Sequence, residues 1–149
     1  MARYAENRKA RFNYEILEKY EAGIELSGSE VKSIRGGQIS LESAFVIVRG
    51  DEVFLINASI PPYQPKNMPK DYDPLRNRRL LLTKKEIDVL AGAEGAKWLT
   101  IVPILLYTKG RKIKVSIGIG RGKKKYDKRE SIKKRDTERD VAREMRERL

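Results

Sequence analysis

Charge is distributed unevenly along this chain, and the imbalance limits which residues can form a folded core. Residues 121–149 contain 13 lysines and arginines against 7 aspartates and glutamates, a net charge of +6. Residues 1–120 carry 20 bases and 14 acids, which gives the same net charge from a far longer segment. Because like charges repel one another, the final segment favours contact with a polyanion over a place in a compact core. We therefore predict a folded domain over residues 1–120 and a basic tail over residues 121–149.

Composition excludes several classes of function. The chain of 149 residues has a net charge of +12 at pH 7 and lacks both cysteine and histidine. Disulfides, thiol nucleophiles and imidazole-based catalytic or metal sites are therefore excluded. No apolar run approaches the roughly 20 residues of a membrane span, and the polar first residues are not typical of a secretory signal. We expect a cytoplasmic protein that binds nucleic acid, with no cofactor, no metal and no membrane contact.

Alternating apolar residues predict that most of the domain is β-structure. The clearest strand covers residues 113–119, where isoleucine and valine alternate with polar side chains. The segment Trp98–Tyr107 is nearly continuously apolar, and its Pro103 requires an edge or a bulge. The expected strands are residues 12–16, 24–26, 44–48, 53–56, 98–107 and 113–119. Six short strands without an internal repeat predict a mainly β protein, a small antiparallel barrel.

Two capping boxes predict short helices that flank the barrel. Ser27 with Glu30 begins the first helix, and Gly36 ends it; Thr83 with Glu86 begins the second, and Gly92 ends it. Residues 1–11 are polar and basic, and we expect a loose arm there. Residues 61–79 contain five prolines and predict a long irregular loop, which in a compact domain is usually functional.

The tail contains one weak helical pattern. Val141, Met145 and Leu149 lie four residues apart, but acidic neighbours at the same spacing weaken an isolated helix. A helix of about 14 residues is marginal in water. We expect the tail to be disordered when free and helical when docked.

Several groups of basic residues are candidates for phosphate contacts. Lys123–Lys125 with Lys128 and Arg129 either neutralise phosphates or only solubilise the tail. Arg76, Arg78 and Arg79 either form a clamp on a nucleic-acid backbone or belong to a solvated loop. The amino-terminal bases Arg8, Lys9 and Arg11 are open to the same two interpretations.

Aromatic and acidic residues add candidates of a different kind. Tyr14 and Tyr20 either pack in the core or stack on unpaired bases, whereas Tyr126, without apolar neighbours, favours stacking. Glu21 is either a surface acid at a turn or an acceptor for base amino groups. Asp71 and Asp73 have the chemistry of Mg²⁺ ligands but lack a third ligand nearby in sequence.

Five segments, taken in order, resemble one protein family, the SsrA-binding proteins, also called small protein B. The matching segments are residues 7–11 (NRKAR), 21–24 (EAGI), 28–35 (GSEVKSIR), 73–82 (DPLRNRRLLL) and 122–129 (GKKKYDKR). The resemblance covers nearly the whole chain, and five ordered motifs are far more specific than any one of them.

This resemblance implies an OB-fold-like barrel with flanking helices and a non-enzymatic RNA-binding adaptor of trans-translation. Such an adaptor binds the tRNA-like domain of transfer-messenger RNA and delivers it to stalled ribosomes. The implied partners are that RNA, the small ribosomal subunit with its rRNA, and elongation factor Tu, the last mainly through the RNA. The expected RNA-binding residues are Asn7, Arg8, Lys9, Arg11, Glu21, Ala22, Gly23, Lys32, Arg35, Arg76, Arg78, Arg79 and Leu81. The expected ribosome-binding residues of the tail are Lys123, Lys124, Lys125, Tyr126, Asp127, Lys128, Arg129, Ile132 and Met145.

Two positions depart from the family pattern, and two other functions compete with the adaptor. Tyr126 stands where many relatives have histidine, so the ring remains but cannot become a cation. Glu144 stands where relatives are apolar, which leaves Met145 as the anchor. The alternatives are a basic structural ribosomal protein and an RNA-processing nuclease that would use Asp71 and Asp73 with Mg²⁺.

Overall fold

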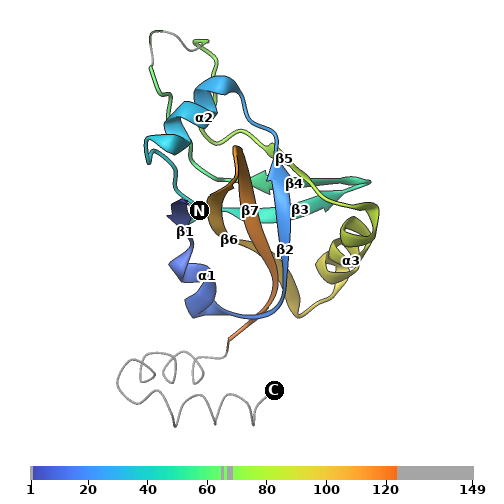
Figure 1. Cartoon of the computed structure of the whole chain (residues 1–149). Helices are drawn as coiled ribbons and strands as arrows, with labels where there is room; N and C mark the ends of the chain where they lie inside the picture. Colours follow the sequence, from blue (N-terminus) through green and yellow to red (C-terminus); the bar gives the residue numbers. More distant parts are fainter. Residues whose placement is uncertain (1, 65, 67–68, 124–149) are drawn as a thin grey trace, which may run out of the picture.

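The computed structural model describes residues 2–64, 66 and 69–123, and these form one curled antiparallel sheet with three short helices (Figure 1). The elements are β1 (Arg3–Glu6), α1 (Arg8–Asn13), β2 (Tyr14–Ile24), α2 (Gly28–Arg35), β3 (Phe45–Arg49), β4 (Glu52–Ile56), β5 (Arg78–Leu81), α3 (Lys84–Gly95), β6 (Leu99–Lys109) and β7 (Lys112–Gly122).

The strand order is β1-β6-β7-β2-β5-β4-β3, and every pairing is antiparallel. The last strand in this order, β3, also contacts β6 near the other edge, so the sheet curls back on itself like a barrel. The mainly β antiparallel fold class is therefore confirmed. Within the described residues the sheet has seven strands, one more than the six predicted.

Two strands, β1 and β5, were not predicted, while two predicted strands merge into β2. For the amino-terminal segment, the expectation of a loose arm is wrong. Strand β1 pairs with β6, with Glu6 opposite Leu105, and the amide of Thr108 donates to the carbonyl of Ala2 at 2.8 Å. Helix α1 follows at once and contacts β2 and β6. The pairing partner lies about a hundred residues away in sequence, so local patterns carry no sign of it.

Strand β2 is one continuous element, whereas two separate strands, residues 12–16 and 24–26, were predicted. It pairs with β7 over almost its whole length, from Tyr14 opposite Gly122 to Gly23 opposite Lys114. An irregularity between Ile16 and Glu18 shifts the register. Such a bulge moves side chains to the other face, which explains why the alternation changes along this segment.

Strand β6 accommodates its proline in the predicted way, at a bulge. The register with β7 shifts between Pro103 and Leu105, although β6 lies inside the sheet between β1 and β7. The side chain of Asn7 donates to the Pro103 carbonyl at 3.0 Å, and the Asn7 amide donates to Ile104 at 2.8 Å. The backbone groups freed by the bulge therefore bond to the turn between β1 and α1.

Both capping boxes form as predicted, but the second helix is longer than expected. Ser27 accepts from the Glu30 amide while Glu30 accepts from the Ser27 amide, and Thr83 and Glu86 do the same for α3. Helix α3 continues through Gly92 to Gly95 and packs against β6 and β3. The expectation that Gly92 ends it is wrong. Among the described residues, no helix has the length and apolar character needed to cross a membrane.

Close packing around Gly118 of β7 leaves no room for a side chain. A Cβ added to Gly118 would lie 2.8 Å from both Ile104 Cδ1 and Ile16 Cγ2, and 3.2 Å from a backbone carbonyl. Ile117, next to it, is fully buried in the core beneath the sheet. The glycines of residues 118–122 therefore belong to the sheet and form no phosphate-binding loop.

We predict that Gly118→Ala destabilises the fold by about 1–3 kcal/mol, because the new methyl group overpacks a filled space. The matched control is Gly92→Ala inside α3, where nothing lies within 4 Å of the new Cβ. That substitution should stabilise the protein by about 0.5–1 kcal/mol through helix propensity. Urea unfolding of the two variants measures both effects; equal stabilities would contradict the packing argument.

Candidate nucleic-acid interface

The structure brings together the EAG segment of β2 and Leu81 of β5. Gly23 lies directly opposite Leu81 in the ladder, and a Cβ on Gly23 would be 3.2 Å from the Leu81 Cβ. Glycine therefore lets the leucine side chain lie close over β2, where it is 47% exposed. Ala22 points into the core and is fully buried, so only its backbone can meet a ligand. These residues lie in paired strands, so the interpretation of Glu21 as an acid at a turn is wrong.

Glu21 is held in position by two neighbours on β6. Its carboxylate accepts a hydrogen bond from the Tyr107 hydroxyl at 2.5 Å and another from Lys109 Nζ at 3.2 Å. These two hydrogen bonds, that of Tyr107 foremost, lower the pKa of Glu21. Burial and the bond to Glu21 raise the pKa of Tyr107 to about 12, so the phenol keeps its proton. Glu21 is thus an ionised, exposed and oriented acceptor with lone pairs left for a ligand amino group.

Basic side chains border this acceptor on the same face of the sheet. Directly paired residues in an antiparallel ladder project to the same side. Lys114 is opposite both Gly23 and Tyr107, and Lys112 is opposite Lys109. The outer face, as we call it below, consists of Glu21, Gly23, Arg79, Leu81, Lys109, Lys112 and Lys114.

Sequence reasoning missed three members of the outer face, namely Lys109, Lys112 and Lys114. The alternation over residues 112–119 identified Lys112 and Lys114 only as the polar side of a strand. The signal that would have found them is the pairing of β7 with β2, which sets Lys114 beside Gly23. That register is a long-range property of the fold.

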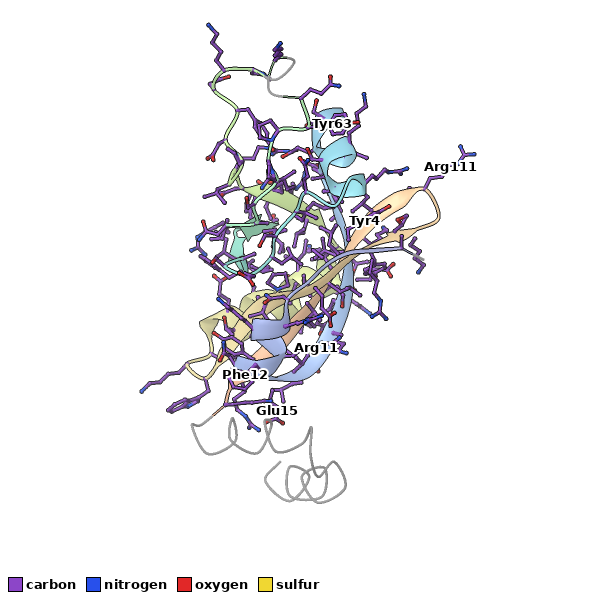
Figure 2. The ribbon with its side chains drawn as sticks, turned by 90° about the vertical axis from the view of Figure 1, so that its left-hand side faces the viewer. Tyr4, Arg11, Phe12, Glu15, Tyr63 and Arg111 are labelled. Atoms are coloured by element: carbon purple, nitrogen blue, oxygen red, sulfur yellow. The ribbon has the colours of Figure 1, made fainter. Side chains whose placement is uncertain are left out.

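The predicted bases of α2 lie next to the outer face. Lys32 and Arg35 are exposed on the last turn of the helix. The Arg35 guanidinium donates to the carbonyl of Arg111, at the tip of the β6–β7 hairpin, at 3.1 Å. Figure 2 shows Arg111 projecting from this tip. The helix therefore supports the hairpin that carries Lys109 and Lys112.

The predicted residues of α1 lie elsewhere, and one of them is buried. Asn7 caps α1 by accepting a hydrogen bond from the Ala10 amide and is only 3% exposed. This burial argues against the predicted contact of Asn7 with RNA. Arg8, Lys9 and Arg11 are exposed on the short helix, and Arg11 lies 3.8 Å from Glu6. In Figure 2, Arg11 lies at the opposite end of the molecule from Tyr63, away from the Arg111 tip. The fold does not bring these bases to the outer face.

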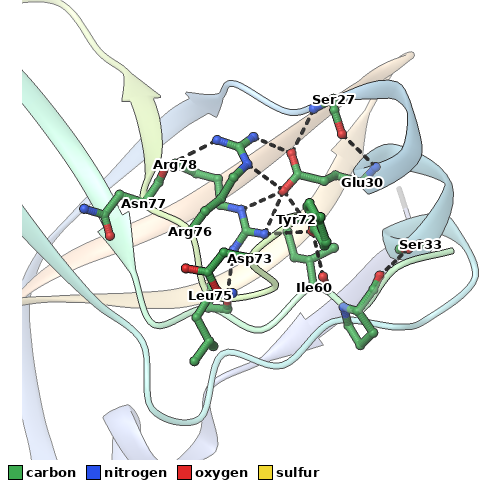
Figure 3. A network of polar contacts seen from close by, with 12 residues as sticks. Ser27, Glu30, Ser33, Ile60, Tyr72, Asp73, Leu75, Arg76, Asn77 and Arg78 are labelled. Atoms are coloured by element: carbon green, nitrogen blue, oxygen red, sulfur yellow. Dashed lines mark hydrogen bonds and ion pairs between the residues drawn. The ribbon is translucent and has the colours of Figure 1, made fainter. Parts of the chain in front are cut away.

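Arg78, predicted to clamp an RNA backbone, lies inside the protein (Figure 3). Its side chain is fully buried, and its guanidinium donates to Glu30 Oε2 from Nε at 3.0 Å and from Nη2 at 2.7 Å. A third bond runs from Nη1 to the Ala58 carbonyl at 2.6 Å. A guanidinium with these buried partners cannot reach a phosphate, so the expectation for Arg78 is wrong.

Arg76 and Tyr72 complete this network around Glu30. Arg76 binds the same carboxylate through Nη2, and through Nε at 3.0 Å. The Tyr72 hydroxyl accepts from Arg78 at 3.1 Å and lies 2.7 Å from the Ile60 carbonyl. Arg76 is thus also committed to an internal partner, although its side chain remains 39% exposed.

The pKa of Glu30 reflects two opposing effects. Burial raises it, but hydrogen bonds from Arg76, the Ser27 amide and Arg78 outweigh burial and hold the pKa at about 2. Glu30 is therefore ionised in the folded protein at every pH above the strongly acidic range. The capping residue of α2 is also the counter-ion of two arginines from the loop that precedes β5 and from β5 itself.

Of Arg76, Arg78 and Arg79, only Arg79 is directed outward by strand β5. Its guanidinium is 45% exposed and lies 3.2 Å from Glu52 and 3.5 Å from Glu25. Exposed pairs of this kind are weak and can be exchanged for a phosphate. Arg79 therefore remains a candidate contact, in a strand and not in a loop as predicted.

Some of the remaining candidate site residues lie in the described part of the chain, and the others lie outside it. Within the described part of the chain, no three potential ligands form a metal site, and the Asp73 carboxylate accepts from the Leu75 amide at 2.9 Å in a turn. Tyr20 donates to Glu18 at 2.5 Å, and Tyr14 is half-buried. Lys123 is the first of the tail candidates; its backbone amide donates to the Asn13 carbonyl and its Nζ to the Arg11 carbonyl. The other tail candidates lie outside the described residues: Lys124, Lys125, Tyr126, Asp127, Lys128, Arg129, Ile132 and Met145.

Comparison with known proteins identifies the family. The family model described as "SmpB protein" matches residues 4–147. The chain belongs to the SmpB family. An SsrA-binding protein of Chloroflexus aggregans is 52% identical over 145 residues, which is 97% of this chain and 92% of that protein. An SsrA-binding protein of Mesoplasma florum is 56% identical over 133 residues, 89% of each chain.

A solved structure supports both the fold and the family. It is described as "tmRNA-SmpB: a journey to the center of the bacterial ribosome", and one of its chains superposes with a TM-score of 0.67 at 44% identity. The match covers 85% of this chain and 92% of that one. The family model extends through the tail, so membership in the SmpB family rests on both parts of the sequence.

We predict that Glu30→Gln destabilises this SmpB-family fold by about 3–5 kcal/mol at neutral pH, because two guanidiniums lose their buried counter-ion. Glu25→Gln is the control, since its exposed carboxylate pairs with Arg79 at 3.5 Å and should contribute under about 1 kcal/mol. Urea unfolding measures both variants.

The unmodified protein and Glu30→Gln should also differ in the pH dependence of their stability. The folded pKa of Glu30 is about 2, below the ordinary value of 4.5, so the unfolded chain binds this proton more readily. The stability that Glu30 contributes is complete above about pH 5 and is lost as the pH falls toward 2. The unfolding free energy should therefore fall more steeply in the unmodified protein than in Glu30→Gln over this range. Parallel curves would show that the network does not bind an ionised carboxylate.

Proposed function

We propose that this protein is an RNA-binding adaptor of trans-translation, which binds the tRNA-like domain of transfer-messenger RNA and delivers it to stalled ribosomes. The observation that supports this most strongly is the match of nearly the whole chain to the SmpB family, at about half identity to SsrA-binding proteins. The description of the related solved structure names tmRNA and the bacterial ribosome together with SmpB, which supports the same role.

The outer face is the surface that we assign to the tRNA-like domain. Leu81, held over Gly23, offers an apolar contact to a base or a sugar. Glu21 accepts hydrogen bonds from exposed base amino groups, which supplies specificity. Lys109, Lys112, Lys114 and Arg79 neutralise phosphates, which supplies affinity. Arg8, Lys9, Arg11, Lys32 and Arg35 are further phosphate contacts in this proposal, while Asn7, Arg76 and Arg78 shape the protein.

The tail is the part that we assign to the small ribosomal subunit. Strand β7 includes Arg121 and Gly122, which pair with β2, so the body extends two residues beyond the predicted boundary at residue 120. Residues 124–135 carry 7 bases and 2 acids, a net charge of +5, and include the Tyr126–Arg129 motif. In this proposal they contact ribosomal RNA in a vacant message channel and become helical there, with Ile132 and Met145 as apolar anchors.

Elongation factor Tu, a cytoplasmic location and the lack of enzymatic activity are finer parts of the same proposal. The factor would be reached mainly through the RNA that it shares with this protein. Peptide transfer and GTP hydrolysis belong to the partners. A nuclease that uses Asp71 and Asp73 gains no support, since Asp73 forms a turn. A structural ribosomal protein is not favoured, because the relatives at high identity are SsrA-binding proteins.

A gel-shift comparison tests the proposal directly. We expect the protein to bind the tRNA-like domain of transfer-messenger RNA at least about tenfold more tightly than ordinary alanine tRNA, a difference of about 1.4 kcal/mol. Specific contacts such as that of Glu21 would cause this preference, whereas generic attraction would not. Equal affinities would reduce the protein to a general polyanion binder.

A charge-removal pair tests the outer face itself. Lys114→Gln should lower the slope of log affinity against log salt by about 0.7–0.9 for the tRNA-like domain, the value for one lost phosphate contact. Lys85→Gln removes the same charge from the exposed first turn of α3 and should leave the slope unchanged. An identical change in both variants would mean that only net charge matters and that the outer face is no binding site.

Removal of residues 124–149 tests the tail. We expect binding to the tRNA-like domain to persist, because the outer face lies entirely in the body. Peptide tagging on stalled ribosomes should be lost, since the segment assigned to the small subunit is gone. The measurement is a reconstituted tagging assay alongside the gel shift. Tagging by the shortened protein would contradict the assignment of the tail.

A further inference from the structure

Trp98 is exposed to an unusual degree for its size. It is the chain's single tryptophan, and 73% of it is accessible, more than any other large hydrophobic residue described. It follows α3, which ends at Gly95, and precedes β6, which begins at Leu99. Tryptophan carries the largest aromatic surface of any side chain and is highly buried on average. An indole left in water at such a position is available for a ligand.

The surroundings of this ring are suited to a polyanion with planar groups. Lys97 Nζ lies 5.5 Å from the centroid of the indole, over one face of the ring. A cation at this distance is attracted by the ring electrons and brings positive charge next to the aromatic surface. Since 73% of Trp98 is accessible, much of the indole surface is open to a ligand.

The strand register places Trp98 at the origin of the basic tail. Its neighbour Leu99 pairs with Arg121, and β7 ends one residue later at Gly122. Lys123 follows, and its backbone amide donates to the carbonyl of Asn13, the last residue of α1. The densest basic segment, residues 121–135 with 9 bases and 2 acids, therefore begins beside the indole. RNA attracted to the first bases of that segment would therefore have the ring within reach.

We infer that Trp98, with Lys97 beside it, is a stacking platform for an unpaired nucleobase of RNA. The inference rests on the proposed function, because it assumes an RNA ligand, and it adds a second contact to it. On β7, Lys114 and Arg121 are seven residues apart, which at about 3.3 Å per residue separates the platform from the outer face by roughly 20–25 Å. The base comes either from transfer-messenger RNA outside the outer-face contact or from ribosomal RNA near the tail.

A single tryptophan makes the platform directly observable. A base stacked on an indole quenches its fluorescence, and all tryptophan emission of this protein comes from Trp98. We expect a short single-stranded oligouridylate to quench the full-length protein, and inorganic polyphosphate to bind without quenching because it has no rings. Binding of the oligonucleotide, seen by anisotropy of a label on it, without any quenching would overturn the inference.

Substitutions then identify the source of the base. Trp98→Ala should weaken binding about five- to tenfold, the lower part of the range for loss of one stacked base. Trp98→Phe keeps a ring and should retain most of the affinity. Val89→Ala, which truncates a 48% exposed residue on α3, is the control for lost apolar surface. A loss toward the tRNA-like domain assigns the base to transfer-messenger RNA, and a loss toward isolated small subunits assigns it to ribosomal RNA; a loss in neither overturns the inference.

Two further outcomes separate this inference from its rivals and from the proposed function. Deleting residues 124–149 should leave the emission of the free protein unchanged; a shift would mean that the tail itself covers the ring, which overturns the inference. If Trp98→Ala binds both partners like the unmodified protein, only the platform fails. If the unmodified protein binds neither the tRNA-like domain nor oligouridylate, the proposed function fails with it.

Discussion

The buried carboxylate of Glu30 is the interaction on which the shape of the outer face, the proposed RNA-binding surface, depends. It joins three parts of the chain that are distant in sequence: the start of α2, the proline-rich loop and β5. Burying charges is costly, and it is tolerated only where every donor and acceptor has a partner. That condition is met, since none of the buried side-chain nitrogen and oxygen atoms in the described part of the chain lacks one. Because Arg78 begins β5, the network fixes the strand that presents Arg79 and Leu81.

Local structure could be predicted from the sequence, and long-range partners could not. The capping box of Ser27 and Glu30 and the alternation of residues 113–119 depend on spacing alone, so both were predicted correctly. Arg76, Arg78 and Arg79 were treated as equivalent, although Arg78 is fully buried and Arg79 points to solvent. Period-two alternation within β5 separates the two faces of the strand. The alternation does not show which face is buried, because the partner that buries Arg78 is Glu30, 48 residues away in sequence.

The outer face shows how strand pairing creates a site that no sequence motif contains. Glu21 and Leu81 belong to segments that the family resemblance singled out, whereas Tyr107, Lys109 and Lys114 belong to none of them. The pairings β2–β7 and β6–β7 bring these residues together and orient the Glu21 carboxylate before any ligand arrives. A carboxylate already held by two donors loses little freedom on binding, so more of its interaction energy appears as affinity and specificity. A negative group within basic surroundings also disfavours ligands that offer phosphates alone.

The long strands β2 and β7 connect the two surfaces of the molecule rigidly. Gly23 pairs with Lys114 at the outer face, and Tyr14 pairs with Gly122 where the tail begins (Figure 1). A hydrogen-bonded ladder does not stretch, so an RNA held at the outer face fixes the position of Lys123 as well. The 26 residues that follow can reach at most about 90 Å from this point. Fixing the origin confines the tail to a limited volume around the bound RNA, which raises its effective concentration at any nearby ribosomal site. Strand pairing in the body therefore determines where the basic charge of the tail can act.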